Sequence, residues 1–153
     1  MWGIFFFYLA LSMAYLRQIQ IRWGDLDPNF HVRHSAYYDY GAFVRVSFFN
    51  EHGMTPTLLQ AHHIGPILFK ESCTFRRELH FGDELTISIQ VTRSKTDYSR
   101  WSMRHELVKQ ENILAAVIEI DGAIIHTNAS LPYRQPFFSH AWRPFPKRLI
   151  LPG

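Results

Sequence analysis

The densest chemistry of this 153-residue chain lies in one short stretch, WGDLDPNFHVRHSAYYDY, at residues 23–40. Within ten residues it holds two carboxylates, an amide and two imidazoles, which belong to Asp25, Asp27, Asn29, His31 and His34. A carboxylate near an imidazole can act as a general base or as a nucleophile. The same residue types also accept hydrogen bonds from loop amides and at helix starts, without any catalytic role. The stretch is therefore either an ordinary polar loop before a helix or the centre of an active site.

The two histidines of this stretch also raise the question of a metal. His31 and His34 stand three residues apart, but a zinc site needs at least a third protein ligand, and none is evident in the sequence nearby. The pair His62-His63 reads as part of a solvated loop. The sequence therefore predicts no metal ion and no other cofactor.

Composition narrows the class of protein. With 47% hydrophobic and 19% charged residues, the chain is predicted to form one globular domain. The net charge of +3 comes from scattered lysines and arginines, whereas nucleic-acid binding usually needs a denser basic face. Cys73 is the only cysteine, so no internal disulfide forms and nothing indicates an oxidising compartment. We expect a cytoplasmic protein in which Cys73 is a buried free thiol rather than a nucleophile.

A long helix is predicted directly after the polar loop, over Ser35–His52. Ser35 is the expected N-cap and Gly53 the residue that ends the helix. Gly41 inside the helix costs about 1 kcal/mol of stability relative to alanine. Either the helix simply tolerates this glycine, or a second backbone passes close to it and leaves no room for a side chain. Apolar side chains recur at helical spacing; they are Tyr37, Tyr40, Phe43, Val44 and Phe48.

Strand patterns surround this helix. A loosely alternating strand is predicted over Tyr15–Trp23, and a loop over Asp25–Arg33. After Gly65-Pro66 the period changes to two, and a Gly82-Asp83 turn separates this strand from the next. The clearest alternation in the chain places four apolar residues on one face; they are Leu85, Ile87, Ile89 and Val91.

Two more strands are predicted at Tyr98–Lys109 and Ile113–Thr127, with Asp121-Gly122 either a hairpin turn or a bulge in one long strand. Short connections imply antiparallel pairing, and one apolar helix must be covered by the sheet. The predicted fold class is therefore α+β, a curved antiparallel sheet of five to six strands wrapped round one long central helix.

The two ends of the chain differ from the middle. Residues 1–13 form an apolar run that is short for a spanning helix of about 20 residues and lacks the positive start of a secretory signal. It can be a membrane-surface anchor, a first strand or an extension outside the domain; we expect an extension, and membrane association stays open. Residues 133–153 are rich in proline and aromatics without periodicity, which predicts an irregular tail.

Three stretches match one known family. The first is RWGDLDPNFHV, with an aspartate pair, a short polar loop and then a helix that has an aromatic residue near its start. The second is GPILFKESCTFRRELHFGDELTISIQVTRS, a strand, a Phe-Gly-Asp turn and another strand, and the third is SRWSMRHELVKQENILAAVIEIDGAI, the last long strands. Together they resemble the hotdog-fold thioesterases, in the 4-hydroxybenzoyl-CoA thioesterase-like and acyl-ACP thioesterase branches. The resemblance implies a hotdog domain over residues 14–132 and favours the bulge at Gly122.

The resemblance also implies catalytic residues. Asp27 falls where many members have the catalytic carboxylate, and Asn29 and His31 complete the Asp-x-Asn-x-His arrangement of acyl-ACP thioesterases. Asp27 would act as general base or nucleophile. Asn29 would orient water or the thioester, and His31 would hold Asp27 in place or protonate the leaving thiolate. Asp25 is expected to be structural.

The chain also departs from the family pattern. Acyl-ACP thioesterases often continue His-Val-Asn-Asn, whereas this chain has Arg33 and His34 after His31-Val32. Some CoA-specific branches instead carry an acidic residue on the central helix, for which Asp39 and Glu51 are the candidates here.

Substrate contacts follow from the same arrangement. The first amides of the helix, at His34 and Ser35, lack intrahelical partners and can form an oxyanion site. Three aromatic residues of the helix, Tyr37, Tyr38 and Phe43, are expected to line an acyl or aryl pocket. Basic side chains on strand edges can meet CoA phosphates or an acidic carrier protein; they are Arg76, Arg77, Arg93, Lys95 and Arg100.

The predicted function is hydrolysis of an acyl-CoA or acyl carrier protein thioester. The alternatives are a non-hydrolytic protein that binds acyl thioesters and a hotdog hydratase or dehydratase. A lipid- or membrane-associated scaffold is a more distant alternative that depends only on the apolar N-terminal run. The resemblance also implies a homodimer or homotetramer, because hotdog domains usually pair edge to edge with the site at the subunit boundary.

Overall fold

The computed structural model describes residues 15–95, 99–127 and 150–151. The predicted apolar extension at residues 1–13 lies outside the described residues. So does the predicted irregular tail, except for a two-residue strand. Within the described part, no helix is both long enough and apolar enough to cross a bilayer.

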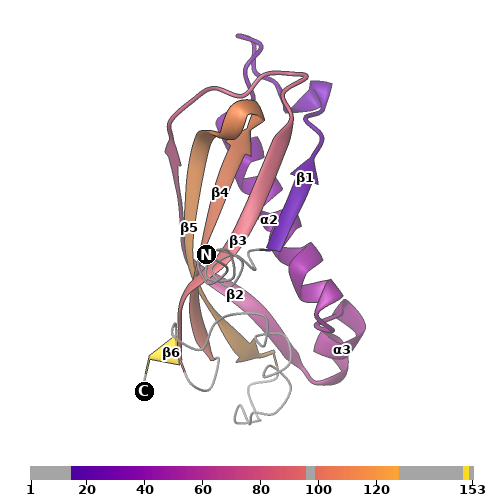
Figure 1. The fold of residues 1–153 in the computed structure, drawn as a ribbon. Coiled ribbons are helices and arrows are strands. Elements are labelled where there is room, and N and C mark those ends of the chain that lie inside the picture. Colours follow the sequence, from indigo (N-terminus) through magenta and orange to yellow (C-terminus); the bar gives the residue numbers. More distant parts are fainter. Residues whose placement is uncertain (1–14, 96–98, 128–149, 152–153) are drawn as a thin grey trace, which may run out of the picture.

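One sheet forms the framework of the molecule (Figure 1). Its hydrogen-bonded order is β1-β3-β4-β5-β2, and every pair in that order is antiparallel. The short β6 pairs with the end of β3 in parallel. The strands are β1 (Tyr15–Ile19), β2 (Ile64–Phe75), β3 (Leu85–Lys95), β4 (Arg100–Lys109), β5 (Ile113–His126) and β6 (Ile150–Leu151). The predicted α+β fold of five to six antiparallel strands with one long helix is confirmed.

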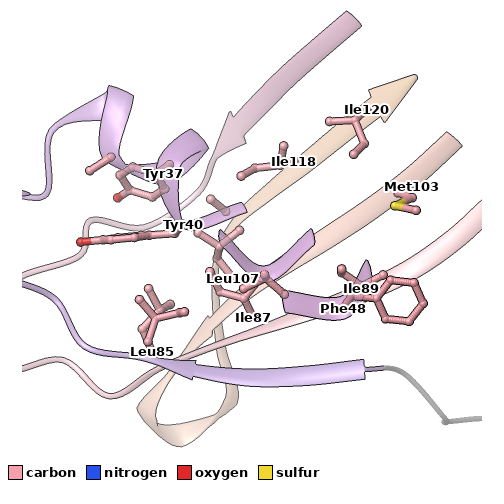
Figure 2. Packing of buried hydrophobic residues seen from close by; sticks show 14 of the residues in the cluster. Tyr37, Tyr40, Phe48, Leu85, Ile87, Ile89, Met103, Leu107, Ile118 and Ile120 are labelled. Atoms are coloured by element: carbon pink, nitrogen blue, oxygen red, sulfur yellow. The ribbon is translucent and has the colours of Figure 1, made fainter. Parts of the chain in front are cut away.

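Among the described residues, two α-helices accompany the sheet, α2 (His34–Glu51) and the short α3 (Pro56–Ala61). The long helix α2 packs its apolar side chains against those of β3, β4 and β5 (Figure 2). The strict alternation predicted for β3 is confirmed, because Leu85, Ile87 and Ile89 are all fully buried. A sheet that buries one face against a helix needs this alternation.

The ends of α2 agree with the sequence prediction to within one residue, but the N-cap does not. The N-cap is Arg33, whose side chain makes no capping hydrogen bond, and Ser35 lies inside the first turn. The hydroxyl of Ser35 instead accepts a hydrogen bond from the Arg33 guanidinium. At the other end Gly53 has φ of 87° just past the helix, as expected for a residue that ends a helix.

The buried face of α2 is rotated relative to the predicted stripe. Phe43 was expected to widen that stripe, but its side chain is 58% exposed. The positions next to Tyr40, Val44 and Phe48 on the other side are buried instead, and they are Gly41, Arg45 and Phe49. Gly41 is small because side chains approach it: an added Cβ would lie 3.1 Å from Ile118 Cδ1 and 3.7 Å from His105 Cδ2.

Arg45 is buried because two other elements supply partners for it. Its Nη1 lies 2.9 Å from Glu71 Oε1 on β2 and 3.3 Å from His105 Nε2 on β4. Burial, followed by the charge of Arg45, lowers the pKa of His105 to about 4, so its ring is neutral at pH 7. The other ring nitrogen, Nδ1, lies 3.0 Å from the Ser88 carbonyl and donates to it.

The Asp121-Gly122 dipeptide does not turn the chain, and β5 runs through it as one strand. The register shifts in the partner strand instead, between Leu68 and Lys70 of β2, so Phe69 is the extra residue. The hairpin alternative is therefore wrong, and the bulge belongs to the neighbouring strand.

Candidate active site

The loop before α2 is a tight turn held by the Asp27 carboxylate. Asp27 Oδ1 accepts hydrogen bonds from the backbone amides of Asn29 at 2.8 Å and His31 at 3.1 Å. The backbone closes the same turn, because the Asp27 amide donates to the His31 carbonyl at 2.7 Å. Phe30 adopts a positive φ of 64° at its tip. Both side-chain bonds use the same oxygen, and among the described residues no donor contacts Oδ2.

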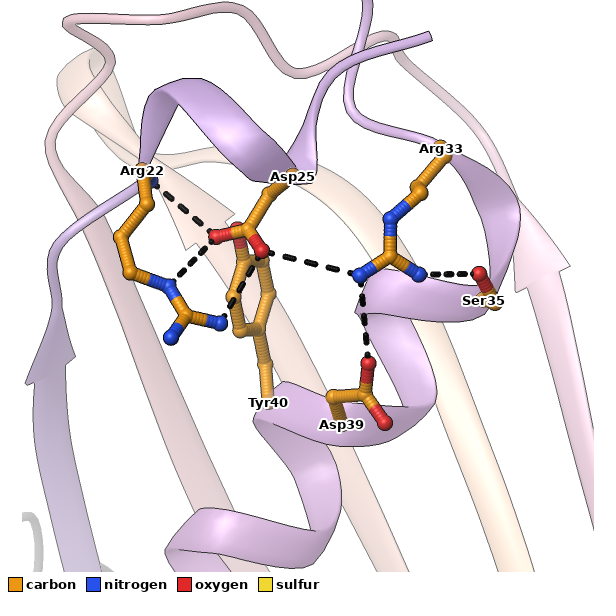
Figure 3. Close-up of polar contacts among 6 residues, drawn as sticks. All are labelled: Arg22, Asp25, Arg33, Ser35, Asp39 and Tyr40. Carbon is orange, nitrogen blue, oxygen red and sulfur yellow. Dashed lines mark hydrogen bonds and ion pairs between the residues drawn. The ribbon is translucent and has the colours of Figure 1, made fainter.

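Asp25, two residues earlier, has a different environment (Figure 3). Its side chain is buried and accepts hydrogen bonds from the Arg22 amide and guanidinium and from the Tyr40 hydroxyl, the last at 2.8 Å. Burial by itself raises the pKa of Asp25, but the bonds from Arg22 and Tyr40 outweigh burial and leave that pKa below its ordinary value. The Asp25 carboxylate therefore ties the loop to α2 as a fixed anion, in keeping with the structural role expected of it.

The start of α2 lies beside Asp27. Ala36 is the first residue whose amide bonds back, to the Arg33 carbonyl at 2.9 Å. In the part of the chain that the structure describes, the amides of His34 and Ser35 donate to no backbone carbonyl. These two amides stand at the positive end of an 18-residue helix. Amides without backbone partners at a helix start are available to donate to an anionic oxygen.

A cavity of about 540 Å³ connects the loop, the helix start and the end of β2. Its volume lies in the range of small-molecule binding sites. Inside the cavity, Tyr37 and Phe75 meet edge to face with ring centroids 5.0 Å apart. The lining residues are Asp27, His31, Val32, His34, Tyr37, Phe75, Arg76, Arg77 and Glu78. Of the predicted site residues, the structure thus brings Asp27, His31, His34 and Tyr37 together.

Other predicted site residues lie elsewhere. Asn29 is exposed and contacts Asp27 through its backbone amide. Ser35, Tyr38 and Phe43 are not among the cavity-lining residues. Arg93, Lys95 and Arg100 lie where β3 ends and β4 begins. Measured along β3, that end of the sheet lies about 25 Å from the end that borders the cavity, because a strand rises about 3.3 Å per residue. The arginines that line the cavity together with Asp27 are Arg76 and Arg77.

One group of residues at the cavity was not predicted from the sequence. His31 lies near Glu78 and His80, rather than forming a pair with His34. His31 and His80 form an isolated antiparallel β-bridge, and their rings meet edge to face at 4.8 Å. The connection between β2 and β3 carries Glu78 and His80, 47 and 49 residues after His31. No local sequence pattern joins positions so far apart.

Cys73 is a poor nucleophile in this structure. Burial, followed by the charge of Glu71, raises the pKa of its thiol to about 11. At neutral pH the side chain is therefore a thiol rather than a reactive thiolate. Cys73 is a free cysteine as expected, but it is half-buried rather than buried.

A protein-family model identifies the family to which this chain belongs. The model of the thioesterase-like superfamily matches residues 21–146, which include the loop, α2 and strands β2 to β5. The chain belongs to the thioesterase-like superfamily. This membership confirms the resemblance inferred from the sequence and the class of enzyme, thioester hydrolase, that it implies. No curated protein sequence matches the chain.

Solved structures agree with this superfamily fold at low sequence identity. A Staphylococcus aureus hypothetical protein in complex with CoA is 19% identical, with a TM-score of 0.77, over 89% of this chain and 88% of that one. The 1,4-dihydroxy-2-naphthoyl-CoA thioesterase of Synechocystis is 16% identical, with a TM-score of 0.71, over 85% and 93%. A gentisyl-coenzyme A thioesterase is 22% identical, with a TM-score of 0.65, over 72% and 88%. These three structural matches show that the chain has the hotdog fold.

Proposed function

We propose that this protein hydrolyses an acyl-CoA or acyl carrier protein thioester, with Asp27 as its catalytic carboxylate. The observation that carries the proposal is that Asp27 and the start of α2 border the same cavity. Thioester hydrolysis needs a base or nucleophile on one side of the carbonyl carbon and donors for the developing oxyanion on the other. The loop and the helix start supply these two groups.

The proposed reaction uses the two oxygens of Asp27 differently. Oδ1 is engaged by the amides of Asn29 and His31, so the carboxylate is held in one orientation. Oδ2 then takes a proton from water that attacks the thioester carbon, or attacks that carbon itself to expel the thiolate and form a mixed anhydride, which water then cleaves. The amides of His34 and Ser35 receive the oxyanion. The leaving thiolate takes the proton that water gives up, and His31, whose amide donates to Asp27 Oδ1, holds the carboxylate in place.

Substrate recognition is proposed at the same cavity. Tyr37 and Phe75 supply an aromatic wall for the acyl group, and Arg76 and Arg77 supply charge for the phosphates of CoA. The neighbouring structures support CoA as the carrier, because one was solved with CoA and two are named as thioesterases of aromatic acyl-CoAs. The cytoplasm remains the proposed location, which the single cysteine supports.

We also propose that the active form is a homodimer, from which a homotetramer can be built. The edge strand β2 leads directly into Phe75–Glu78 at the cavity, so a copy paired on β2 would lie beside the cavity. An antiparallel pairing of two β2 strands would bring the far end of one sheet toward the cavity of the other. This arrangement would give Arg93, Lys95, Arg100, Tyr38 and Phe43 a route to substrate that a single chain does not offer.

The test is release of free thiol from short, long and aromatic acyl-CoAs, and from the same acyl groups on a carrier protein. Asp27→Asn keeps an acceptor for the turn amides but removes the base, so kcat is expected to fall at least about 100-fold. The matched variant is Asp39→Asn, because Asp39 is the alternative candidate for the catalytic carboxylate on the helix. Its side chain is 63% exposed and does not line the cavity. We expect Asp39→Asn to change kcat by less than about threefold, well below the effect of losing a general base.

Four results would reject parts of this proposal. Full activity in Asp27→Asn rejects Asp27 as the base, and loss of activity in Asp39→Asn assigns the reaction to the helix carboxylate. Binding of acyl-CoA without thiol release from any substrate identifies a non-hydrolytic binding protein. Addition of water to an enoyl thioester identifies the hydratase alternative.

A further inference from the structure

The cavity has a cluster of metal-ligating side chains at its rim. His31 Nε2 lies 3.5 Å from Glu78 Oε2, and the ligand atoms of His31, Glu78 and His80 all lie within 4.8 Å of one another. Two ligands of a tetrahedral zinc ion stand about 3.4 Å apart when each bond is about 2.1 Å. The His31–Glu78 pair already has this spacing. The side chain of His80 is 48% exposed, so a rotation can bring its ring nitrogen to the same centre.

The backbone beneath this cluster is firmly held. Two antiparallel contacts join the loop to the β2–β3 connection: the His31–His80 bridge and the hydrogen bond from the Val32 amide to the Leu79 carbonyl at 2.8 Å. Leu79, between the two ligands Glu78 and His80, is fully buried in the core. The three ligands therefore project from anchored backbone rather than from free surface loops. A preorganised backbone lowers the entropic cost of binding an ion.

A carboxylate also lies near one of the three ligands. Asp83 Oδ2 lies 3.9 Å from His80 Nδ1 and accepts a hydrogen bond from the His80 amide at 2.9 Å. Asp83 is itself held by Gln110 at 2.7 Å and Lys109 at 3.4 Å. Metal-binding histidines commonly place their second ring nitrogen toward such a carboxylate, which leaves the first nitrogen for the ion.

We propose that His31, Glu78 and His80 bind a divalent transition-metal ion of the zinc class. Two imidazoles and one carboxylate are a ligand set that Zn²⁺, Co²⁺ and Ni²⁺ accept. Three protein ligands leave at least one coordination position for water or another small ligand. Because His31 and Glu78 also line the cavity, the ion would stand at its rim. It would join the Asp27 loop to the β2–β3 connection.

The test measures metal binding without any thioester, so its result is independent of the proposed hydrolysis. Untagged full-length protein, freed of metal with a chelator, is titrated with Zn²⁺ by calorimetry and with Co²⁺ by visible absorption. One ion per chain and a tetrahedral or five-coordinate Co²⁺ spectrum are expected. His80→Ala and Glu78→Gln are each expected to raise the dissociation constant more than about 10-fold, and Asp83→Asn by about 10-fold.

The matched control is His34→Ala. His34 is the histidine that sequence spacing pairs with His31, and it lies in the same cavity but outside the cluster. Its removal is expected to leave the dissociation constant within about twofold. Far-ultraviolet circular dichroism checks that each variant is folded. The proposal is overturned if the wild-type protein binds no ion, or if His80→Ala and Glu78→Gln bind Zn²⁺ as tightly as the wild type while His34→Ala does not.

Discussion

At the scale of single residues, Asp25 and Asp27 show how position within a turn separates two identical side chains. Asp25 points into the protein and is surrounded by donors from Arg22 and Tyr40. Asp27 uses one oxygen for the turn and lies at the cavity wall. The bonds to Asp25 contribute to folding stability, whereas Asp27 faces the cavity. The catalytic role of Asp27, which the family resemblance implies, stays a prediction.

The low pKa of Asp25 predicts how its contribution depends on pH. A carboxyl group whose pKa is lower in the folded state stabilises that state above its unfolded pKa, here an ordinary 3.8, and the contribution is lost as pH falls through the folded value. Asp25→Asn is expected to lower the free energy of unfolding by about 1–3 kcal/mol near pH 7, as for a hydrogen-bonded charged group. The difference in the free energy of unfolding between wild type and Asp25→Asn, the gap between the two proteins, should disappear below about pH 3.8.

Urea denaturation of wild type and Asp25→Asn at a series of pH values measures this gap. Asp39→Asn is the control, because Asp39 is 63% exposed and its only ion pair within the described part of the chain is with Arg33 at 3.6 Å. Its effect should stay within about 0.5 kcal/mol at every pH. A gap for Asp25→Asn that stays constant from pH 7 to pH 3 would contradict the assignment.

At the scale of elements, local periodicity predicted the long strands and the helix α2 well. The alternation of residues 85–92 is strict because one face of β3 is buried against α2. The helix was predicted at Ser35–His52 and is observed at His34–Glu51, since Gly53 and the change of pattern mark its end. β1 ends early, at Ile19, because the chain then enters a short 3-10 turn at Trp23–Asp25.

Features that depend on contacts between distant elements were not predictable. Arg45 looks like a surface residue, and only Glu71 on β2 and His105 on β4 make its burial possible. The rotation of the buried face toward Arg45, which leaves Phe43 in solvent, follows from the same contacts. The cluster of His31, Glu78 and His80 likewise depends on a bridge between two loops. Periodicity within one element contains no information on such pairs.

The packing of β5 against β4 and β2 predicts that one methyl group added at Gly122 will destabilise the folded protein. A Cβ added at Gly122 would lie 2.5 Å from the Trp101 ring on β4 and 2.6 Å from the Ile67 carbonyl on β2. Gly122→Ala must therefore displace a buried ring or a strand backbone, which is expected to cost about 1–3 kcal/mol. Thermal unfolding should show a midpoint several degrees lower.

Gly24→Ala is the matched control for this substitution. Nothing lies within 4 Å of a Cβ at Gly24, and its φ is outside the left-handed region. Its stability should match that of the wild type within about 0.5 kcal/mol or rise slightly, because alanine restricts the unfolded chain. Equal melting temperatures for the two variants would show that β5 tolerates a side chain at Gly122.

At the scale of the whole molecule, the two edges of the sheet are unlike. Among the described strands, β1 and β2 are the ends of the hydrogen-bonded order. The edge strand β2 carries three large apolar side chains that are at least 42% exposed, Leu68, Phe69 and Phe75. An edge strand presents unpaired backbone groups, and exposed apolar side chains beside them favour association. The β2 edge is therefore where we expect the second copy of the proposed dimer.

This arrangement predicts that charge on one edge, but not on the other, will dissociate the dimer. Phe69 is 56% exposed on β2 and Leu16 is 58% exposed on β1, so each tolerates lysine without a change in the core. Phe69→Lys is expected to raise the dimer dissociation constant at least about 10-fold, because an exposed apolar side chain of the proposed interface is replaced by a charge in both copies. Leu16→Lys should leave it unchanged. Sedimentation velocity over a range of protein concentrations measures both, and dissociation by Leu16→Lys with a stable Phe69→Lys dimer would place the interface on β1, away from the cavity.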